Sequence, residues 1–294
     1  MIPEAQGRRW ALEPGDEVLP GRTAIRRLGT GERFETYLAW DERRLALVVV
    51  KLVRPHLAAD GHSLRRLAAE AGLLERLRHP VIVRGLEADL EGPRPHVVLE
   101  HLEGPRLSRL VRRHGRLEPE QLVPLGAQLA AALHYMAAEG VAHLDVKPAN
   151  VIMAAPARLI DLSIAREVTD LPGVTARLGT VAYMSPEQLE PGERGPLTTA
   201  TDVWGMGATL YHAAAGRPAF EAPRRRDGPF AQLAGPPEPL PSSVPTRVAS
   251  LVMACMEPLP ADRPTPAAVA AELEEQAASM RRRPVLGRFR VRGR

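Results

Sequence analysis

The sequence predicts an α+β protein with two unequal lobes, a small antiparallel β-rich lobe followed by a larger helical lobe. Two observations support this prediction. Strand-forming runs separated by turn residues occupy much of the first hundred positions, and after Gly104 the pattern changes to long apolar stripes at helical spacing. With 294 residues, the chain is long enough for each lobe to bury a core and for a cleft to lie between them.

The predicted small lobe contains three strands and one helix. Its strand-like runs are rich in β-branched and aromatic residues and are bounded by turn residues; they are Thr36 to Trp40, Leu45 to Val53 and His96 to Glu100. Residues 64–78 differ, because their apolar side chains stand at positions 64, 67, 71, 74 and 77. That spacing puts the apolar side chains on one face and predicts an amphipathic helix beside the sheet.

The predicted large lobe contains four helices and one long surface loop with at most a short helix. The longest helix carries a single apolar stripe and ends at Gly140. The last helix follows Thr265, a candidate N-cap, and has Pro266 at its first position. The helices cover Glu118 to Glu139, Asp202 to Ala215, Pro245 to Met256 and the residues from Thr265 onward, and the Pro- and Arg-rich loop covers Arg217 to Val248.

Charge and composition argue against several classes of function. The net charge of +4 comes from arginines spread along the chain, which is typical of a solvated surface, so no nucleic-acid partner is expected. The single cysteine, Cys255, excludes a disulfide framework and a cysteine-based zinc site, and its apolar neighbours predict burial. No membrane-span-like run of about 18 apolar residues and no signal-peptide pattern is present, so we expect a soluble cytoplasmic protein.

Two residue types are scarce enough to be informative. Lys51 and Lys147 are the only lysines among 39 basic residues, and Asn150 is the only asparagine. Arginine has replaced lysine wherever a general surface cation is enough. A lysine or asparagine that remains is therefore a candidate for chemistry that arginine or aspartate cannot perform.

Lys51 has a predicted partner in the helix of the small lobe. It ends an apolar strand, where a buried ammonium needs a counter-ion. Glu70 lies on the apolar face of the predicted helix, three residues after Leu67 and four before Leu74. The pattern predicts an ion pair between Lys51 and Glu70, which taken alone is also compatible with a purely structural role.

A pair of glycines precedes the strand that carries Lys51. The run Leu28-Gly29-Thr30-Gly31 stands at a turn between predicted strands, and Thr36 begins the next strand. Backbone without side chains can approach a triphosphate closely. A glycine pair in a hairpin more often serves only to form the turn, so this motif alone does not indicate nucleotide binding.

Four polar residues after the longest helix match the requirements of phosphoryl transfer. That reaction needs a carboxylate that accepts the hydroxyl proton, a cation on the γ-phosphate, and oxygen ligands for magnesium. The stretch 143–150 reads HLDVKPAN and supplies Asp145, Lys147 and Asn150, and Asp161 follows soon after. Together these residues offer the complete set within one short part of the chain.

These motifs resemble those of eukaryotic-like bacterial serine/threonine protein kinases, from about Val18 to Ala278. The resemblance implies a two-lobed protein kinase fold with Asp145 as catalytic base, Lys147 and Lys51 as phosphate contacts, and Glu70 as the partner of Lys51. It assigns nucleotide binding to Leu28, Gly29, Thr30, Gly31, Thr36, Lys51, Leu99 (the gatekeeper position), Glu100 and Leu102, and magnesium binding to Asn150 and Asp161.

Motifs farther along the chain are also similar to those of the family. Gly179-Thr180 resembles the loop that receives the acceptor residue, and Ser185-Pro186-Glu187 stands where the family usually has Ala-Pro-Glu. The runs Asp202 to Gly205 and Asp262 to Pro264 complete the pattern of the large lobe. The resemblance also implies a structural salt bridge between Glu187 and Arg263.

The resemblance implies ATP and Mg²⁺ as cofactors, a protein substrate with a Ser or Thr acceptor, and self-association for autophosphorylation at Thr169 or Thr175. It divides the chain into an N-terminal extension at residues 1–17, a kinase domain at residues 18–278 and a basic tail at residues 279–294. The two lobes of the kinase domain cover residues 18–101 and 102–278. The arginine-rich tail is expected to be flexible. It is compatible with a solvated terminus and with a weak contact to anionic lipid or an acidic partner.

Three positions depart from the family pattern and leave two alternatives open. Phe34 replaces the third loop glycine, Leu144 replaces the arginine before the catalytic aspartate, and Leu162-Ser163 replaces Phe-Gly after Asp161. One alternative is a catalytically weak pseudokinase that acts as a nucleotide-binding scaffold. The other is a small-molecule phosphotransferase, which would not need the Ser-Pro-Glu motif or Asp262-Arg263.

Overall fold

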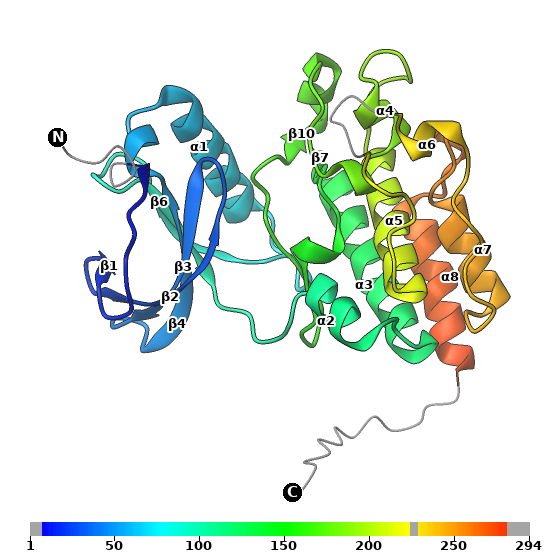
Figure 1. The fold of residues 1–294 in the computed structure, drawn as a ribbon, viewed down its shortest axis with the longest axis horizontal. Helices are drawn as coiled ribbons and strands as arrows, with labels where there is room; N and C mark the ends of the chain where they lie inside the picture. The colour runs from blue at the N-terminus through cyan, green and yellow to red at the C-terminus, as the bar shows by residue number, and fades with distance from the viewer. Residues whose placement is uncertain (1–7, 224–228, 281–294) are drawn as a thin grey trace, which may run out of the picture.

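The computed structural model describes residues 8–223 and 229–280 and contains the two predicted lobes. Figure 1 shows a β-sheet with the long helix α1 on one side of the molecule and a larger group of helices on the other. Within the described ranges, no helix combines the length and apolar composition that crossing a membrane requires. The predicted fold class is confirmed.

The small lobe is built on a six-stranded antiparallel sheet with the strand order β1-β2-β3-β4-β6-β5. Strands β3 and β4 pair along their whole length, and Thr36 stands directly opposite Lys51. Residues that pair in this way direct their side chains to the same face of the sheet. The strands are β1 (Glu17–Leu19), β2 (Arg22–Thr30), β3 (Phe34–Asp41), β4 (Ala46–Val53), β5 (Gly85–Asp89) and β6 (His96–Glu100).

Strands β1 and β5 were not predicted from the sequence, and the strand before the glycine pair, β2, was expected without bounds. β1 and β5 lie at the two edges of the sheet, where partly exposed strands need no apolar alternation. β2 carries two exposed arginines, Arg26 and Arg27, and a buried one, Arg22, which hides its strand pattern. The conformation of these strands is therefore specified by hydrogen bonding to neighbouring strands and not by the pattern of their own side chains.

Helix α1 (Gly61–Arg76) is the predicted amphipathic helix of the small lobe, and Figure 1 shows it packed beside the sheet. It begins three residues before the apolar pattern because the carboxylate of Asp60 accepts a hydrogen bond from the backbone N–H of Ser63 at 2.8 Å. Its buried face includes Leu67, Leu74 and Glu70. The helix thus carries a carboxylate toward the sheet, as predicted.

The large lobe has α3 at its centre, packed against α5 and α8. Contact with α8 is so close that a Cβ added at Gly126 would lie 2.6 Å from Leu273 Cδ1. Cys255 is fully buried, as predicted. The helices are α2 (Leu107–His114), α3 (Pro119–Ala138), α4 (Pro186–Leu189), α5 (Ala200–Ala215), α6 (Ala231–Ala234), α7 (Thr246–Ala254) and α8 (Pro266–Ser279). Helix α2 was not predicted.

Two small antiparallel ribbons face the cleft side of the large lobe. Strand β7 (Val141–Ala142) pairs with β10 (Arg166–Glu167), and β8 (Val151–Ile152) pairs with β9 (Arg158–Leu159). Residues 143–150 therefore run between two paired strands, which holds both ends of this loop in place.

The predicted salt bridge between Glu187 and Arg263 is present in the core of the large lobe. Arg263 donates to both carboxylate oxygens, at 2.7 and 2.8 Å, and neither side chain is exposed to solvent. Arg263 also donates to the backbone carbonyls of Ala200, Glu257 and Pro258. The pair therefore joins three separate segments of the lobe.

We expect Arg263→Ala to lower the free energy of unfolding by about 3–5 kcal/mol, because it leaves the carboxylate of Glu187 buried without its cation. Arg247→Ala is the matched control, since Arg247 is 60% exposed and solvent screens its pairs with Glu272 and Glu275, which should contribute little to stability. Urea unfolding followed by circular dichroism measures both. Equal losses for the two variants would show that the buried pair has no special structural role.

Candidate active site

The hairpin between β2 and β3 covers a cavity of about 440 Å³. The backbone N–H of Gly31 donates to the carbonyl of Phe34 at 2.9 Å, which closes the turn. A Cβ at Gly29 would meet no atom within 4 Å, so protein packing does not require this glycine. The bare backbone instead leaves room for a ligand. The residues around the cavity include Gly29, Thr30, Gly31, Thr36, Lys51, Arg66, Asp161 and Ser163.

Lys51 forms the predicted ion pair at the inner end of this cavity. Its ammonium lies 2.8 Å from both carboxylate oxygens of Glu70 and 3.1 Å from Oδ1 of Asp161. Burial acts to lower the pKa of Lys51, but the two carboxylates outweigh it and raise the pKa above its ordinary value. The amine is therefore charged, and it joins strand β4, helix α1 and the segment after β9.

Asp161 keeps its negative charge in this surrounding. Burial acts to raise the pKa of Asp161, yet the charge and hydrogen bond of Lys51, together with the N–H of Ser163, hold it well below its ordinary value. Its side chain remains 40% exposed at the cavity. An ionised carboxylate is thus available to a cation there.

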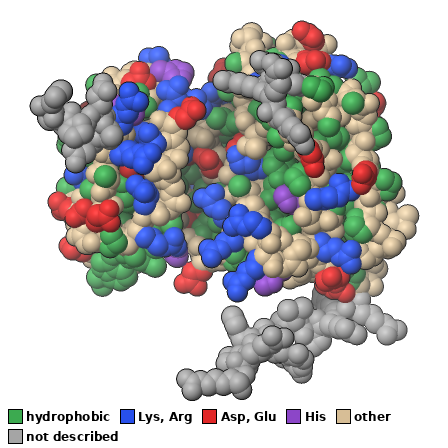
Figure 2. Space-filling model, in the orientation of Figure 1, with side chains coloured by type: hydrophobic (Ala, Val, Ile, Leu, Met, Phe, Trp, Pro, Cys, Tyr) green, Lys and Arg blue, Asp and Glu red, His purple; other side chains and the backbone are tan. Residues whose placement is uncertain are grey.

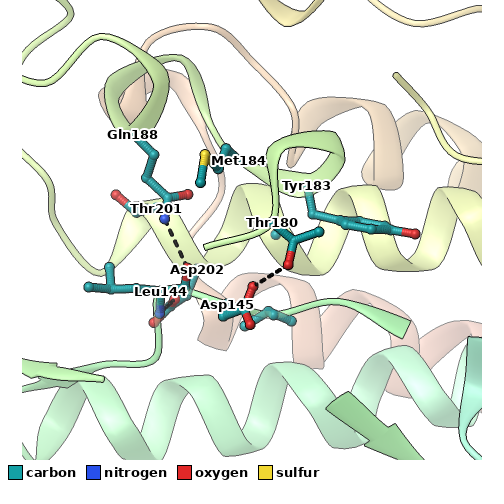
Figure 3. A pocket seen from close by; sticks show the side chains of 10 residues that line it. Leu144, Asp145, Thr180, Tyr183, Met184, Gln188, Thr201 and Asp202 are labelled. Carbon is teal, nitrogen blue, oxygen red and sulfur yellow. Dashed lines mark hydrogen bonds between the residues drawn. The ribbon is translucent and has the colours of Figure 1, made fainter. Parts of the chain in front are cut away.

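The loop from His143 to Asn150 brings the second group of predicted residues together. Lys147 Nζ lies 2.5 Å from Asp145 Oδ2 and 2.6 Å from the hydroxyl of Thr180. That hydroxyl donates to Asp145 Oδ1 at 3.0 Å, as Figure 3 shows. The amide of Asn150 donates to the carbonyl and to Oδ2 of Asp145, at 3.0 and 3.1 Å. The carboxylate of Asp145 is therefore oriented by three neighbours.

The loop is anchored by two residues, Asp202 and Gln188, whose role was not predicted from the sequence. The backbone N–H groups of His143 and Leu144 donate to the buried carboxylate of Asp202 at 2.6 and 2.7 Å. Gln188 donates to the carbonyl of Leu144 at 2.9 Å (Figure 3). The space enclosed here is only about 10 Å³, room for about one water, so these side chains pack closely around the loop and hold it in place.

Leu144 lies in an apolar setting that explains its side chain. Its backbone φ is 65°, a left-handed conformation that Asp202 and Gln188 stabilise through hydrogen bonds. The side chain is buried in an apolar cluster with Leu171 and Leu197. An arginine at this position would have to place its charge among these apolar groups.

The other two departures from the family pattern also have defined places. Leu162 is 1% exposed and belongs to the main core, so it fills an apolar site. Phe34 is the first residue of β3, and its ring centroid is 5.0 Å from Lys51 Nζ. Phe34 therefore shields the lysine side of the cavity with an aromatic face.

Four of the residues predicted to bind the nucleotide lie outside this cavity. Leu99 and Leu102 are half-buried against the main core at the link between the lobes. The carboxylate of Glu100 points elsewhere, since it accepts from the N–H of Arg84 and from Arg158. Leu28, like these three, does not line the cavity. The enclosed space corresponds to the phosphate end of the predicted site.

Asn150 and Asp161 fit a magnesium ion that is shared with a nucleotide. The amide nitrogen of Asn150 is used by Asp145, which leaves its oxygen free, and Asp161 presents an ionised carboxylate. Within residues 8–223 and 229–280, no cluster of three or more His, Cys, Asp or Glu residues forms a complete metal site. Few protein ligands are typical of Mg²⁺ that also binds phosphates.

A family model described as protein kinase domain matches residues 22–274. The chain belongs to the protein kinase family. Serine/threonine-protein kinase PkaA of Streptomyces coelicolor is 36% identical over 226 residues, which are 74% of this chain and 41% of that protein. A probable serine/threonine-protein kinase of Thermomonospora curvata, PkwA, is 35% identical over 269 residues, 89% of this chain and 35% of that protein.

A third relative of the same kind is serine/threonine-protein kinase PknB of Mycobacterium leprae, 36% identical over 203 residues. The match covers 66% of this chain and 32% of that protein. The chain thus spans well under half the length of these curated relatives. The predicted resemblance to bacterial serine/threonine kinases is confirmed, and the kinase domain of the chain is what the relatives share with it.

Proposed function

We propose that this chain is an ATP-dependent protein kinase that transfers the γ-phosphate to Ser or Thr hydroxyls of proteins. The observation that supports it best is the contact of Asp145 with both Lys147 and an aliphatic hydroxyl, that of Thr180. A substrate Ser or Thr would present the same kind of hydroxyl to this carboxylate. The serine/threonine kinases among the relatives support the same assignment.

In the proposed reaction, the acceptor oxygen attacks the γ-phosphorus, the bond from that phosphorus to the β,γ-bridging oxygen breaks, and ADP leaves. Asp145 orients the hydroxyl and accepts its proton. Lys147 and Lys51 offset the negative charge of the phosphates. Asn150 and Asp161 would hold magnesium, which supplies further charge neutralisation when bound.

The two alternatives have less support. A pseudokinase would be expected to lack at least one polar group, whereas Lys51, Glu70 and Asp161 contact one another and Asp145 contacts Lys147. A small-molecule phosphotransferase does not require the buried pair of Glu187 with Arg263. Both features favour a protein kinase.

The direct test is incubation of the purified chain with labelled ATP, magnesium and a general basic protein, followed by phosphoamino-acid analysis. Phosphoserine or phosphothreonine that disappears on chelation of magnesium is the expected result. Label only on tyrosine would refute the assignment of the acceptor. Nucleotide binding without any labelled product would favour the pseudokinase.

Asn150→Ala should raise the magnesium concentration needed for half-maximal activity at least about tenfold, since losing even an outer-shell partner typically reduces metal affinity about 10–100-fold. A magnesium titration of activity measures the change. Asn150→Asp is the matched control because it keeps a ligand oxygen but loses the amide donor to Asp145. An unchanged titration for Asn150→Ala would mean that magnesium is bound elsewhere.

Autophosphorylation of the loop would require self-association, and we expect it to have little effect on the rate. Leu144 occupies the place of a phosphate-gripping arginine and is packed with Leu171. Arg177, which could replace it, donates to the carbonyl of Leu189 at 2.7 Å and lies over the ring of Phe230. The nearby guanidinium is therefore already engaged.

The double variant Thr169→Ala/Thr175→Ala should keep initial rates within about threefold, a change under 1 kcal/mol in the barrier. Thr180→Ala is the contrasting variant and should reduce the rate, because Thr180 contacts both Asp145 and Lys147. Initial rates of dephosphorylated protein at low enzyme concentration provide the measurement. A lag that preincubation with ATP removes would show that loop phosphorylation activates the enzyme. The basic tail and its predicted lipid contact lie outside the described residues.

A further inference from the structure

Helix α2 and its flanks carry an unusual concentration of positive charge. Five exposed arginines lie within eleven positions: Arg106, Arg109, Arg112, Arg113 and Arg116. Among the residues that the structure describes, none of the five forms an ion pair with a carboxylate. Figure 2 shows blue side chains gathered below the cleft, in the region where Figure 1 places α2.

The stability of α2 does not explain the first of these arginines. Arg106 is the N-cap residue of the helix, and its side chain makes no capping hydrogen bond. Ser, Thr, Asp or Asn is preferred at this position, and a cation is unfavourable beside the positive end of the helix dipole. Arg112 and Arg113 differ, because cations in the last turn favour the helix. A residue that breaks a local rule in this way is a candidate for function.

Arg106 is also tied to the catalytic loop. Its guanidinium donates to the carbonyl of Ala149 at 3.1 Å, and Ala149 directly precedes Asn150. Asn150 in turn donates to Asp145. One side of the arginine therefore contacts the segment that holds the proposed catalytic base, while the rest of the side chain is exposed to solvent.

The arginines continue away from this point along one face of the helix. Arg106, Arg109 and Arg113 are spaced three and four residues apart, so they lie on one stripe. The buried residues Leu107 and Val111 define the opposite, inward face. At 1.5 Å per residue the stripe is about 10 Å long, which an extended peptide covers with about three residues.

We propose that this stripe binds acidic residues of the protein substrate close to its acceptor Ser or Thr. The inference rests on the proposed kinase function and names its substrate class. The exposed carboxylates of Glu103, Glu118 and Glu120 flank the stripe. They would repel a broad anionic surface such as a membrane but leave a short acidic segment free to bind between them.

The test compares two variants that remove the same charge. Arg109→Ala/Arg113→Ala removes two charges of the stripe and leaves the contact of Arg106 with Ala149 in place. Alanine is a strong helix former, so a loss of activity cannot be attributed to a weakened helix or a displaced catalytic loop. Arg26→Ala/Arg43→Ala removes two exposed arginines from the small lobe and is the matched control. Substrates are paired peptides with one Ser acceptor and three Glu or three Gln residues on either side of it.

The Glu peptides place the acidic residues either before or after the acceptor, and one of the two should be preferred. For the parent protein, kcat/KM for that peptide should be about tenfold higher than for its Gln counterpart, which is the effect expected from two solvent-exposed ion pairs. The preference should fall with rising salt. Arg109→Ala/Arg113→Ala should lose it while the rate with the Gln peptide stays within about twofold, and the control variant should keep it. Equal rates for Glu and Gln peptides would overturn the proposal.

Two further readouts separate the possible failures. If the stripe variant kept the Glu preference but lost binding to vesicles rich in phosphatidylserine, the stripe would be a membrane contact and the proposal would be wrong. Transfer of phosphate to the chain itself or to a general basic protein tests the kinase function independently of the peptides. Activity there without a Glu preference refutes only the substrate class, whereas no transfer at all refutes the proposed function.

Discussion

Asp145→Asn is expected to reduce phosphotransfer by about two to four orders of magnitude, the usual contribution of a positioned general base. The substitution keeps the size of the side chain, and an amide can still contact Lys147 or the hydroxyl of Thr180. It cannot accept the proton of the acceptor hydroxyl. The loss should therefore appear in kcat, while the affinity for ATP changes little.

Single-turnover kinetics and a nucleotide-binding titration on the same preparation separate these effects. Asp170→Asn makes the same chemical change at an exposed position of the loop and should leave both quantities unaltered. A fall in ATP affinity with an unchanged kcat would place Asp145 in nucleotide binding and argue against its role as the base.

Lys51→Met should reduce kcat/KM for ATP by about two to three orders of magnitude, which is typical when one preorganised group that stabilises developing charge is removed. Among the described residues that line the cavity, Lys51 carries the only ammonium, and it is held by both Glu70 and Asp161. Methionine fills a similar volume without charge. The variant should fold, because burial raises the pKa of Glu70 and lets the unpaired carboxyl take up a proton.

The double variant Lys51→Met/Glu70→Gln distinguishes chemistry from stability. It removes the unpaired acid, so its melting temperature should recover toward that of the parent protein while activity stays low. Recovery of activity along with stability would mean that Lys51 acts mainly as a structural partner of Glu70. Parent-like turnover of Lys51→Met itself would refute the proposed ATP site.

Local pattern was enough to predict most of the secondary structure. The apolar stripes of α3, α5, α7 and α8 and the β-branched runs of β4 and β6 carry their own periodicity, because one face of each element is buried. Strand β5 lacks a clear stripe, and the apolar stripe of helix α2 covers only eight residues, too short a stretch to predict a helix by itself. Pairing at a sheet edge and packing against the large lobe decide their conformation instead.

The chemical groups of the candidate site were also readable from the chain. Lys51, Lys147 and Asn150 stand out against a composition that avoids lysine and asparagine, and helical spacing alone pointed Glu70 toward Lys51. Residues that act chemically must keep their identity, since no other side chain offers the same donor, charge and shape. Such residues are therefore visible without a structure.

Only the tertiary structure decided how these groups are held and what surrounds them. The support of the catalytic loop by Asp202 and Gln188 joins positions more than forty residues apart, and no local pattern encodes such a contact. The contact of Arg106 with Ala149 is equally nonlocal. The sequence by itself determined the fold class and the reactive side chains, because periodicity and chemical identity are local properties. The anchoring of the loop and the basic stripe beside it depend on which distant segments meet, which packing of the whole chain determines.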